Sequence, residues 1–333
     1  MKILFVAKKA QQPSYRFRVE QMLPAFQARG HECKTVFGAR GNLCCLLEVL
    51  SGGVDVVFVQ WQALPRALTA LLRARVKTLV YDIDDAVMYD NSGEPHSRGA
   101  GRFAAMARAA DVVVCGNRFL ASAVEELGGE AVVVPTCIDT VRFHPSRRLR
   151  PPPRRGARLV VGWTGSHTNN ASLSQLFPVL ARFRDSIEVR VMSSNQNGLD
   201  YELLRGVPYT FNHWTAESEV DEVGRYDIGV MPMPNTKWTQ GKCALKALQY
   251  MALGLPAVAS PIGANREVIV DGESGFLPET PDAWSQTLER LIERPELRER
   301  TGRAGRARVE ESYSVAAVGP QLVSAVEEAA CSS

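Results

Sequence analysis

The chain alternates short runs of Val, Ile and Leu with longer amphipathic stretches, and it does so on both sides of a proline triplet. Uninterrupted apolar runs are typical of strands that are buried on both faces of a parallel sheet. When such strands alternate with helical stretches, the connections are crossover units, which make consecutive strands parallel. The sequence therefore predicts two Rossmann-like α/β domains, each with a doubly wound parallel sheet.

The same periodicity gives the expected elements. Strands are predicted at residues 2–7, 33–37, 55–60, 77–82, 111–116 and 131–136, and then at 158–163, 187–192, 208–211, 227–231 and 256–260. Helices are predicted at residues 16–29, 62–74, 117–127, 172–183, 244–253, 282–293, 295–311 and 315–329. Ligands of such sheets bind beyond the carboxyl ends of the strands, so the loops after the strands are the expected sites.

Residues 147–156 hold three consecutive prolines among arginines, a composition that bars a helix or a central strand and predicts a linker. We expect a first domain at 1–150 and a second at 151–314, with a cleft between them. The amphipathic stretch at 315–333 is expected to pack back on the first domain.

Composition excludes several classes of protein. The chain has 333 residues, of which 45% are hydrophobic and 23% charged, so disorder and a coiled coil are excluded as descriptions of the whole. No run approaches the ~18 apolar residues of a membrane-spanning helix, and the apolar start is too short for a signal peptide. Seven cysteines without a Cys-x-x-Cys pair indicate buried reduced thiols and no metal site. A cytoplasmic protein is expected.

The charge is unevenly distributed. Residues 1–150 carry 20 Lys and Arg against 14 Asp and Glu, whereas the remainder carries 19 against 22. A basic first half favours an anionic partner, although an ordinary solvated surface explains the same numbers. Nucleic acid is not expected as a partner, because the net charge is only +3 and the basic residues are dispersed.

Two stretches of the second half suit phosphate groups. Gly165 and Ser166 follow a predicted strand, and small residues there let backbone N–H groups approach an anion. Farther on, Lys242, Lys246 and Gln249 fall on one face of a predicted helix. Two lysines near a helix start oppose the helix dipole unless an anion is bound, so they predict a diphosphate site.

Residues 249–260 read Gln-Tyr-Met-Ala-Leu-Gly-Leu-Pro-Ala-Val-Ala-Ser. Five residues continue the pattern at fixed distances: Gly263, Glu267, Asp271, Gly272 and Gly275. This pattern resembles the signature of the group-1 glycosyltransferases, family 4, and the resemblance covers residues 160–314. It implies the GT-B fold and a nucleotide-sugar donor (UDP-, GDP-, ADP- or dTDP-linked), with no cofactor or metal required. By the same resemblance, the first domain would bind the acceptor and the second the nucleotide-sugar.

The resemblance also implies roles for single residues. Lys242 and Lys246 would stabilise the leaving diphosphate, Gln249 would bind the ribose, and the loop of Gly263 and Asn265 would line the donor site. The nucleobase is expected near His213. The sequence departs from the family at both glutamates of its Glu-x7-Glu signature, because Gly241 and Gln249 stand there.

In the first half, Arg16 and Arg18 form either a basic fork for a phosphate or carboxylate, or part of a helix surface. Asp84 and Asp85 end a predicted strand and are expected to orient an acceptor hydroxyl. Asn117 is predicted to cap the following helix.

The function expected from the resemblance is a retaining glycosyltransferase of glycan, glycolipid or cell-envelope polysaccharide synthesis. Its acceptor would be a saccharide or lipid-linked saccharide, and the basic first half favours an anionic acceptor or contact with the inner face of a membrane. Two alternatives stay open: a nucleotide-sugar epimerase of the same fold, and a non-catalytic nucleotide- or sugar-binding protein.

Overall fold

The computed structural model describes residues 1–150 and 156–332 and divides them into two compact units. The first unit contains Met1–Cys137, Thr236–Cys243 and the C-terminal helix α15 (Val315–Ser332). The second contains Ile138–Asn235 and Ala244–Ser314. The prolines of the expected linker, 151–153, lie outside the described residues.

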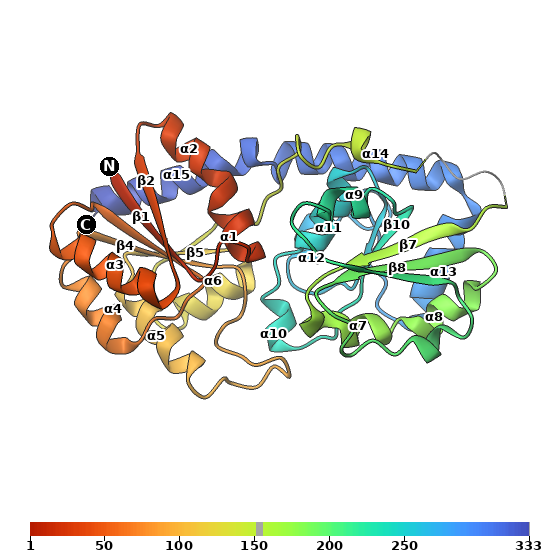
Figure 1. The fold of residues 1–333 in the computed structure, drawn as a ribbon, viewed down its shortest axis with the longest axis horizontal. Helices are drawn as coiled ribbons and strands as arrows, with labels where there is room; N and C mark the ends of the chain where they lie inside the picture. The colour runs from red at the N-terminus through yellow and green to blue at the C-terminus, as the bar shows by residue number, and fades with distance from the viewer. Residues whose placement is uncertain (151–155, 333) are drawn as a thin grey trace. The chain divides into compact units, whose positions relative to one another are not determined.

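The first unit is built on a six-stranded parallel sheet (Figure 1). Its strand order is β2-β1-β3-β4-β5-β6, with β1 (Lys2–Ala7), β2 (Glu32–Phe37), β3 (Val56–Gln60), β4 (Thr78–Ile83), β5 (Val112–Cys115) and β6 (Ala131–Val133). Its other helices are α1 (Pro13–Arg18), α2 (Leu23–Ala28), α3 (Gly38–Leu50), α4 (Arg66–Arg73), α5 (Gly99–Ala109), α6 (Arg118–Glu125) and α10 (Lys237–Gln240).

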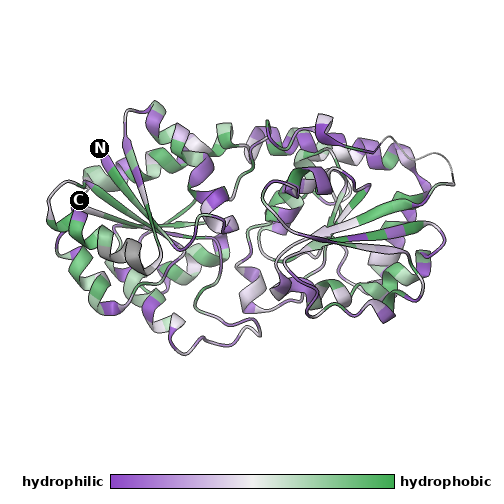
Figure 2. Cartoon of the chain, in the orientation of Figure 1, coloured by the Kyte–Doolittle hydropathy of each residue, from purple (hydrophilic) through white to green (hydrophobic). Residues whose placement is uncertain are grey.

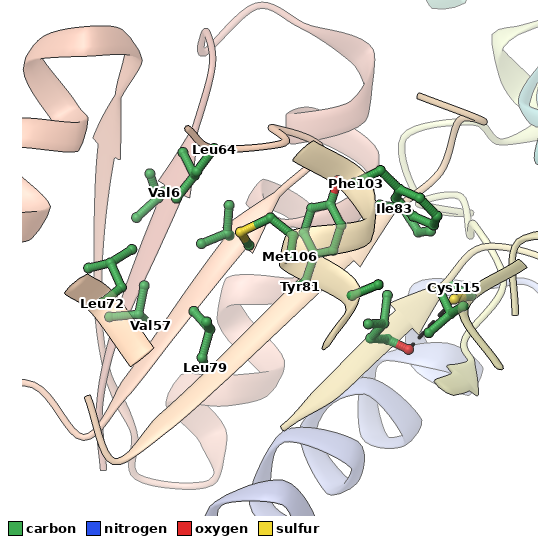
Figure 3. Packing of buried hydrophobic residues seen from close by; sticks show 14 of the residues in the cluster. Val6, Val57, Leu64, Leu72, Leu79, Tyr81, Ile83, Phe103, Met106 and Cys115 are labelled. Carbon is green, nitrogen blue, oxygen red and sulfur yellow. Dashed lines mark hydrogen bonds between the residues drawn. The ribbon is translucent and has the colours of Figure 1, made fainter. Parts of the chain in front are cut away.

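Both faces of this sheet are buried, which explains its uninterrupted apolar strands. Val57 and Leu79 face a cluster with Leu72 of α4 and Phe103 of α5 (Figure 3). The alternate residues of the same strands face a second cluster that includes Leu322 of α15. Each such buried side chain contributes about 1.5–3 kcal/mol relative to an exposed one. In Figure 2 the central strands are accordingly hydrophobic along most of their length.

The second unit contains a five-stranded parallel sheet in the order β11-β10-β7-β8-β9. Its strands are β7 (Leu159–Thr164), β8 (Ile187–Ser193), β9 (Tyr209–His213), β10 (Ile228–Met231) and β11 (Ala257–Ala259). Its helices are α7 (Asn170–Ser174), α8 (Phe177–Leu180), α9 (Glu219–Val223), α11 (Leu245–Ala252), α12 (Asn265–Val268), α13 (Pro281–Glu293) and α14 (Pro295–Ser312).

Every predicted strand is present, with ends that differ by a few residues. Two predicted helices are broken. The stretch 16–29 divides into α1, a 3-10 turn and α2, and the stretch 172–183 divides into α7, α8 and a further 3-10 turn. Prolines at the starts of α2 and α8 explain the breaks, because proline lacks the N–H of a helical hydrogen bond and its ring clashes with the preceding turn. Helices α3, α5, α9, α10 and α12 were not predicted.

Two further predictions need correction. Cys45, Cys115, Cys137 and Cys243 are buried, but Cys44 and Cys331 are exposed thiols. The segment Thr236–Cys243, expected in the second domain, packs within the first unit.

None of the described helices is long and apolar enough to cross a membrane.

Candidate functional site

The loop after β4 places two carboxylates at the carboxyl end of the first sheet. Asp85 accepts a hydrogen bond from the Lys242 ammonium, with Nζ and Oδ1 2.7 Å apart. The same ammonium lies 3.8 Å from the centre of the Trp238 ring. Asp85, Lys242 and Trp238 therefore form one charged and aromatic group within the first unit.

Asp84 lies beside this group in a less polar environment. Burial, followed by repulsion from Asp85 and Asp82, raises the pKa of Asp84 to about 7. Its Oδ1 atom is buried and has no hydrogen-bond partner among the described residues. A carboxyl group with such a pKa exchanges a proton readily near neutral pH.

Arg18 has a different place from the one expected. Its side chain is 2% exposed, pairs with the fully buried Asp82, and donates from Nη1 to the Val134 carbonyl oxygen at 2.7 Å. Its guanidinium thus joins α1 to the ends of β4 and β6. We therefore correct the prediction of an anion-binding fork at Arg18. Arg16 is also buried, so the alternative of a solvated helix surface is wrong, and its anion-binding role stays a prediction.

Asn117 caps α6 as predicted, accepting a hydrogen bond from the Leu120 amide at 3.0 Å. Its amide nitrogen also donates to the carbonyl oxygens of Gln240 and Lys242. These bonds hold the α10 segment against the first sheet. A Cβ atom at Gly241 would lie 2.5 Å from that of Ala86, so a larger residue at this position would collide with the loop after β4.

The predicted lysine pair is not part of one helix face. Helix α11 begins at Leu245, after Ala244 adopts the left-handed conformation with a φ of 58°. Lys242 precedes this reversal and belongs to the first unit, whereas Lys246 is in α11 and belongs to the second. The expectation that Lys242, Lys246 and Gln249 share a helix face is therefore wrong for Lys242.

In the second unit, the loop after β7 and the start of α11 come together. A Cβ atom at Gly165 would lie 2.6 Å from Cε of Lys246 and 2.7 Å from the Trp163 ring, so only glycine fits between them. Ser166 is exposed next to this point and accepts a hydrogen bond from the Asn169 amide. The structure thus brings together Gly165, Ser166 and Lys246, three of the predicted residues.

Gln249 has a hydrogen-bond partner that the sequence did not predict. Its side chain is 2% exposed, and its Nε2 atom donates to Oε1 of Glu219 at 3.0 Å. The indole N–H of Trp214 donates to the same oxygen at 3.1 Å. Glu219 lies 30 residues before Gln249, at the start of α9, and no local pattern connects the two. Nε2 is thus engaged by Glu219, and the amide oxygen is the one acceptor atom of the Gln249 side chain.

The remaining predicted donor residues lie at other loops of this unit. Asn265 is fully buried and donates from its side chain to the Ser260 carbonyl oxygen at 2.8 Å, so it braces the turn that contains Gly263. Gly263 has a φ of 55°, a conformation that favours glycine. His213 is exposed at the end of β9 and packs edge-on against Phe211. The described residues contain no group of three or more His, Cys, Asp or Glu that would hold a metal ion.

The sequence matches a known protein family and several curated proteins. Residues 158–294, which lie in the second unit except for Thr236–Cys243, match the family "Glycosyl transferases group 1". A curated relative is the GDP-mannose-dependent alpha-(1-6)-phosphatidylinositol dimannoside mannosyltransferase of Mycobacterium tuberculosis, 25% identical over 64% of this chain. The match covers 58% of that relative's length.

Solved structures share the fold across nearly the whole chain. Sucrose-phosphate synthase from Thermosynechococcus elongatus superimposes with a TM-score of 0.80 at 13% identity and covers 100% of both chains. Anabaena Alr3699/HepE in complex with UDP and glucose has a TM-score of 0.74 at 15% identity and covers 98% of this chain and 100% of its own. The predicted GT-B fold and the predicted resemblance to the group 1 glycosyl transferases are thereby confirmed, the resemblance over residues 158–294.

Proposed function

We propose that the protein is a glycosyltransferase that moves a sugar from a nucleotide-sugar to an acceptor hydroxyl. The observation that carries the proposal is the family match over residues 158–294, within which Gly165 and Lys246 meet at the carboxyl end of β7. A glycine loop beside an ammonium group suits a diphosphate, because backbone N–H groups and a positive charge approach it together.

The donor is assigned to the second unit. Lys246 stabilises the negative charge that grows on the leaving diphosphate, and the amide oxygen of Gln249 accepts hydrogen bonds from the ribose hydroxyls. Resemblance to the family favours retention of the anomeric configuration. HepE, of similar fold, was solved with UDP and glucose, and the mycobacterial relative is GDP-mannose-dependent, which supports UDP and GDP as the first nucleotides to test.

The acceptor is assigned to the first unit, where Asp84 and Asp85 lie beyond β4. One of these carboxylates orients the acceptor hydroxyl. The mycobacterial relative acts on a phosphatidylinositol mannoside, which supports a lipid-linked saccharide as one acceptor class and synthesis of a glycolipid or envelope polysaccharide as the role. We place the reaction in the cytoplasm, with the acceptor presented at the membrane surface.

The first experiment is a thermal-shift panel with UDP, GDP, ADP, dTDP and CMP. A nucleotide at ~100 times its dissociation constant adds ~2.7 kcal/mol to the free energy of unfolding, which raises the melting temperature visibly. One stabilising diphosphate identifies the donor class. Stabilisation by none of them contradicts the proposal.

Lys246→Ala tests the chemistry once a donor is known. The variant is expected to lower turnover by on the order of a hundredfold or more, because a preorganised contact to the leaving group is lost. Lys237→Ala, at an exposed lysine in the first unit, is the control. Conversion of the donor without an acceptor would identify an epimerase, and nucleotide binding without turnover on any acceptor would identify a binding protein.

A further inference from the structure

A pocket of about 800 Å³ opens at the carboxyl end of the first sheet, and all of its lining residues belong to the first unit. Lys8 follows β1, Trp61 follows β3, and Asp85 follows β4, three strands that are neighbours in the sheet. The wall is completed by the loop after Asp85, the start of α5 and Trp238 of α10. This volume is in the range of pockets that enclose small organic ligands.

Aromatic rings form part of the wall. Trp61, Tyr89 and Trp238 line the pocket, and Asp85 lies on the same wall. Indole and phenol rings offer flat apolar faces with a polar edge, which suits the C–H face of a pyranose ring and its hydroxyl groups. Aromatic rings beside a carboxylate therefore favour a saccharide over a purely apolar ligand.

The backbone conformation of Trp61 and the environment of its indole N–H are both energetically unfavourable. Its φ is 61°, in the left-handed region that non-glycine residues rarely adopt. Its indole N–H is buried and finds no acceptor among the residues that the structure describes. Strain of this kind costs about 1–3 kcal/mol and gathers at ligand sites, where the surrounding structure enforces it.

The pocket also carries positive charge that is not neutralised. Lys8, Arg98 and Arg102 are exposed on its wall, and within the described ranges 1–150 and 156–332 none of them forms an ion pair. Lys8 contacts the Trp61 ring, with Nζ 4.5 Å from its centre. Guanidinium groups without a carboxylate partner are suited to bind a carboxylate or phosphate in a bidentate manner.

The two acidic residues of the wall offset these cations only in part, so the wall keeps a net positive charge. Asp85 is already paired with Lys242. The Asp90 carboxylate accepts hydrogen bonds from the hydroxyl and the amide of Ser92 and from the Glu94 amide. The bond from the Ser92 hydroxyl, together with the backbone bonds, lowers the pKa of Asp90. Asp90 is therefore ionised but is used to shape its own loop.

The loop that carries Asp90 is held at the edge of the pocket by backbone hydrogen bonds. Tyr89 and Pro95 form an antiparallel bridge, and the His96 amide donates to the Met88 carbonyl oxygen at 2.8 Å. His96 accepts a hydrogen bond at Nδ1 from the Gly99 amide at 2.9 Å, which leaves its Nε2 atom as a donor. The loop thus presents Arg98 and a histidine N–H at the same rim.

We propose that this pocket binds the acceptor and selects an acidic saccharide, one whose sugar ring carries a carboxylate or a phosphate. The sugar packs against the rings of Trp61 and Trp238, and its anionic group binds to Arg98 and Arg102. The inference rests on the proposed function, because it names the acceptor class for the same reaction. Carboxylate and phosphate share this chemistry, and the experiment separates them.

The test is calorimetric titration of the full-length chain with three matched disaccharides. One is neutral, one carries a uronic acid at the same ring, and one carries a phosphomonoester there. We expect at least one acidic disaccharide to bind about tenfold more tightly than the neutral one, with an advantage that shrinks as salt is raised. The tighter of the two acidic probes identifies the anion.

Matched variants test the assignment of residues. Arg98→Gln and Arg102→Gln are each expected to weaken binding of the acidic disaccharide about tenfold and to leave the affinity for the neutral disaccharide unchanged. Arg75→Gln, at an exposed arginine of the same unit outside the pocket, leaves both affinities unchanged. Trp61→Gly keeps the backbone conformation, which glycine adopts readily, and is expected to weaken binding of all three disaccharides.

Equal affinity for neutral and acidic disaccharides, or unchanged binding by both arginine variants, would overturn the inference. Nucleotide binding is measured on the same preparations. Failure of the proposed function appears as absence of nucleotide stabilisation, whereas failure of this inference appears as loss of the acidic preference alone.

Discussion

Gln249 and Glu219 illustrate how one buried contact decides which residue a position accepts. The resembling family carries a glutamate where Gln249 stands, yet here a second carboxylate, Glu219, lies within hydrogen-bond distance. Two buried carboxylates at that distance repel each other, and one of them must take up a proton. An amide avoids this cost because it donates to Glu219 with its nitrogen and still presents an oxygen.

Gln249→Glu, which introduces the family residue, is therefore expected to destabilise the protein rather than improve it. The expected loss is about 1–3 kcal/mol at neutral pH, because a buried donor is replaced by a second acceptor. The measurement is denaturant unfolding. The double variant Gln249→Glu with Glu219→Gln restores a donor and an acceptor and should recover most of the loss. No recovery would show that the pair does not act as a unit.

Asp84 gives a prediction about pH. Its carboxyl ionises near 3.8 in an unfolded chain and near 7 in the folded protein, where burial disfavours its charge. Between these values the folded state binds more protons, so the contribution of Asp84 to stability falls as the pH rises from about 4 to about 7 and is constant above that.

The amide introduced by Asp84→Asn cannot ionise. The melting temperature of this variant should therefore exceed that of the wild type by more at pH 8 than at pH 5. Asp185→Asn, at a carboxylate that is 89% exposed, is the matched control. An equal difference at both pH values would contradict the raised pKa. Activity of the variant is a separate question, because Asp84 is a candidate acceptor residue.

At the scale of elements, the Arg18–Asp82 pair joins α1, β4 and β6 beneath the loop that carries Asp84. Both side chains are almost completely buried. A single removal leaves one charge buried without its partner, whereas replacing both by apolar residues removes the charge altogether.

Asp82→Ala is expected to lower the free energy of unfolding by about 3–5 kcal/mol. The double variant Arg18→Met with Asp82→Leu should lose clearly less than the single one. Glu279→Ala, which breaks the exposed Arg266–Glu279 pair, serves as the control and should change stability by less than about 1 kcal/mol. A small effect of Asp82→Ala would show that the pair is not structurally important.

At the scale of the whole molecule, the first unit is assembled from distant parts of the chain. Helix α15 packs in the first unit although it follows the second in sequence, and it contributes Val318, Leu322 and Val326 to the core. The first sheet is thus covered on one face by residues from both ends of the chain.

Leu322→Ala should reveal this dependence as a loss of about 2–5 kcal/mol, because the variant leaves a cavity beneath the first sheet. Ser324→Ala, on the exposed side of the same helix, is the control. Hydrogen exchange of the β4 and β5 amides provides the readout, and faster exchange is expected there in Leu322→Ala. Unchanged protection would mean that α15 does not support that sheet.

The sequence by itself determined the strands, the parallel sheets and the fold type. The reason is physical: strands buried on both faces need continuous apolar residues, and crossover helices need an amphipathic period, so both leave a local signal. The cap at Asn117 is local in the same sense, since it depends on the Leu120 amide three residues on.

The tertiary structure alone decided the pairs. Arg18 with Asp82, Gln249 with Glu219 and Lys242 with Asp85 are separated by 64, 30 and 157 residues, and no local pattern marks them. Arg18, Gln249, Lys242 and Asp85 looked like candidate ligand-binding groups in the sequence, and each has a partner within its own unit. Charge and hydrogen-bonding capacity are properties of a residue, but whether they are available to a ligand depends on which distant residues the fold brings beside it.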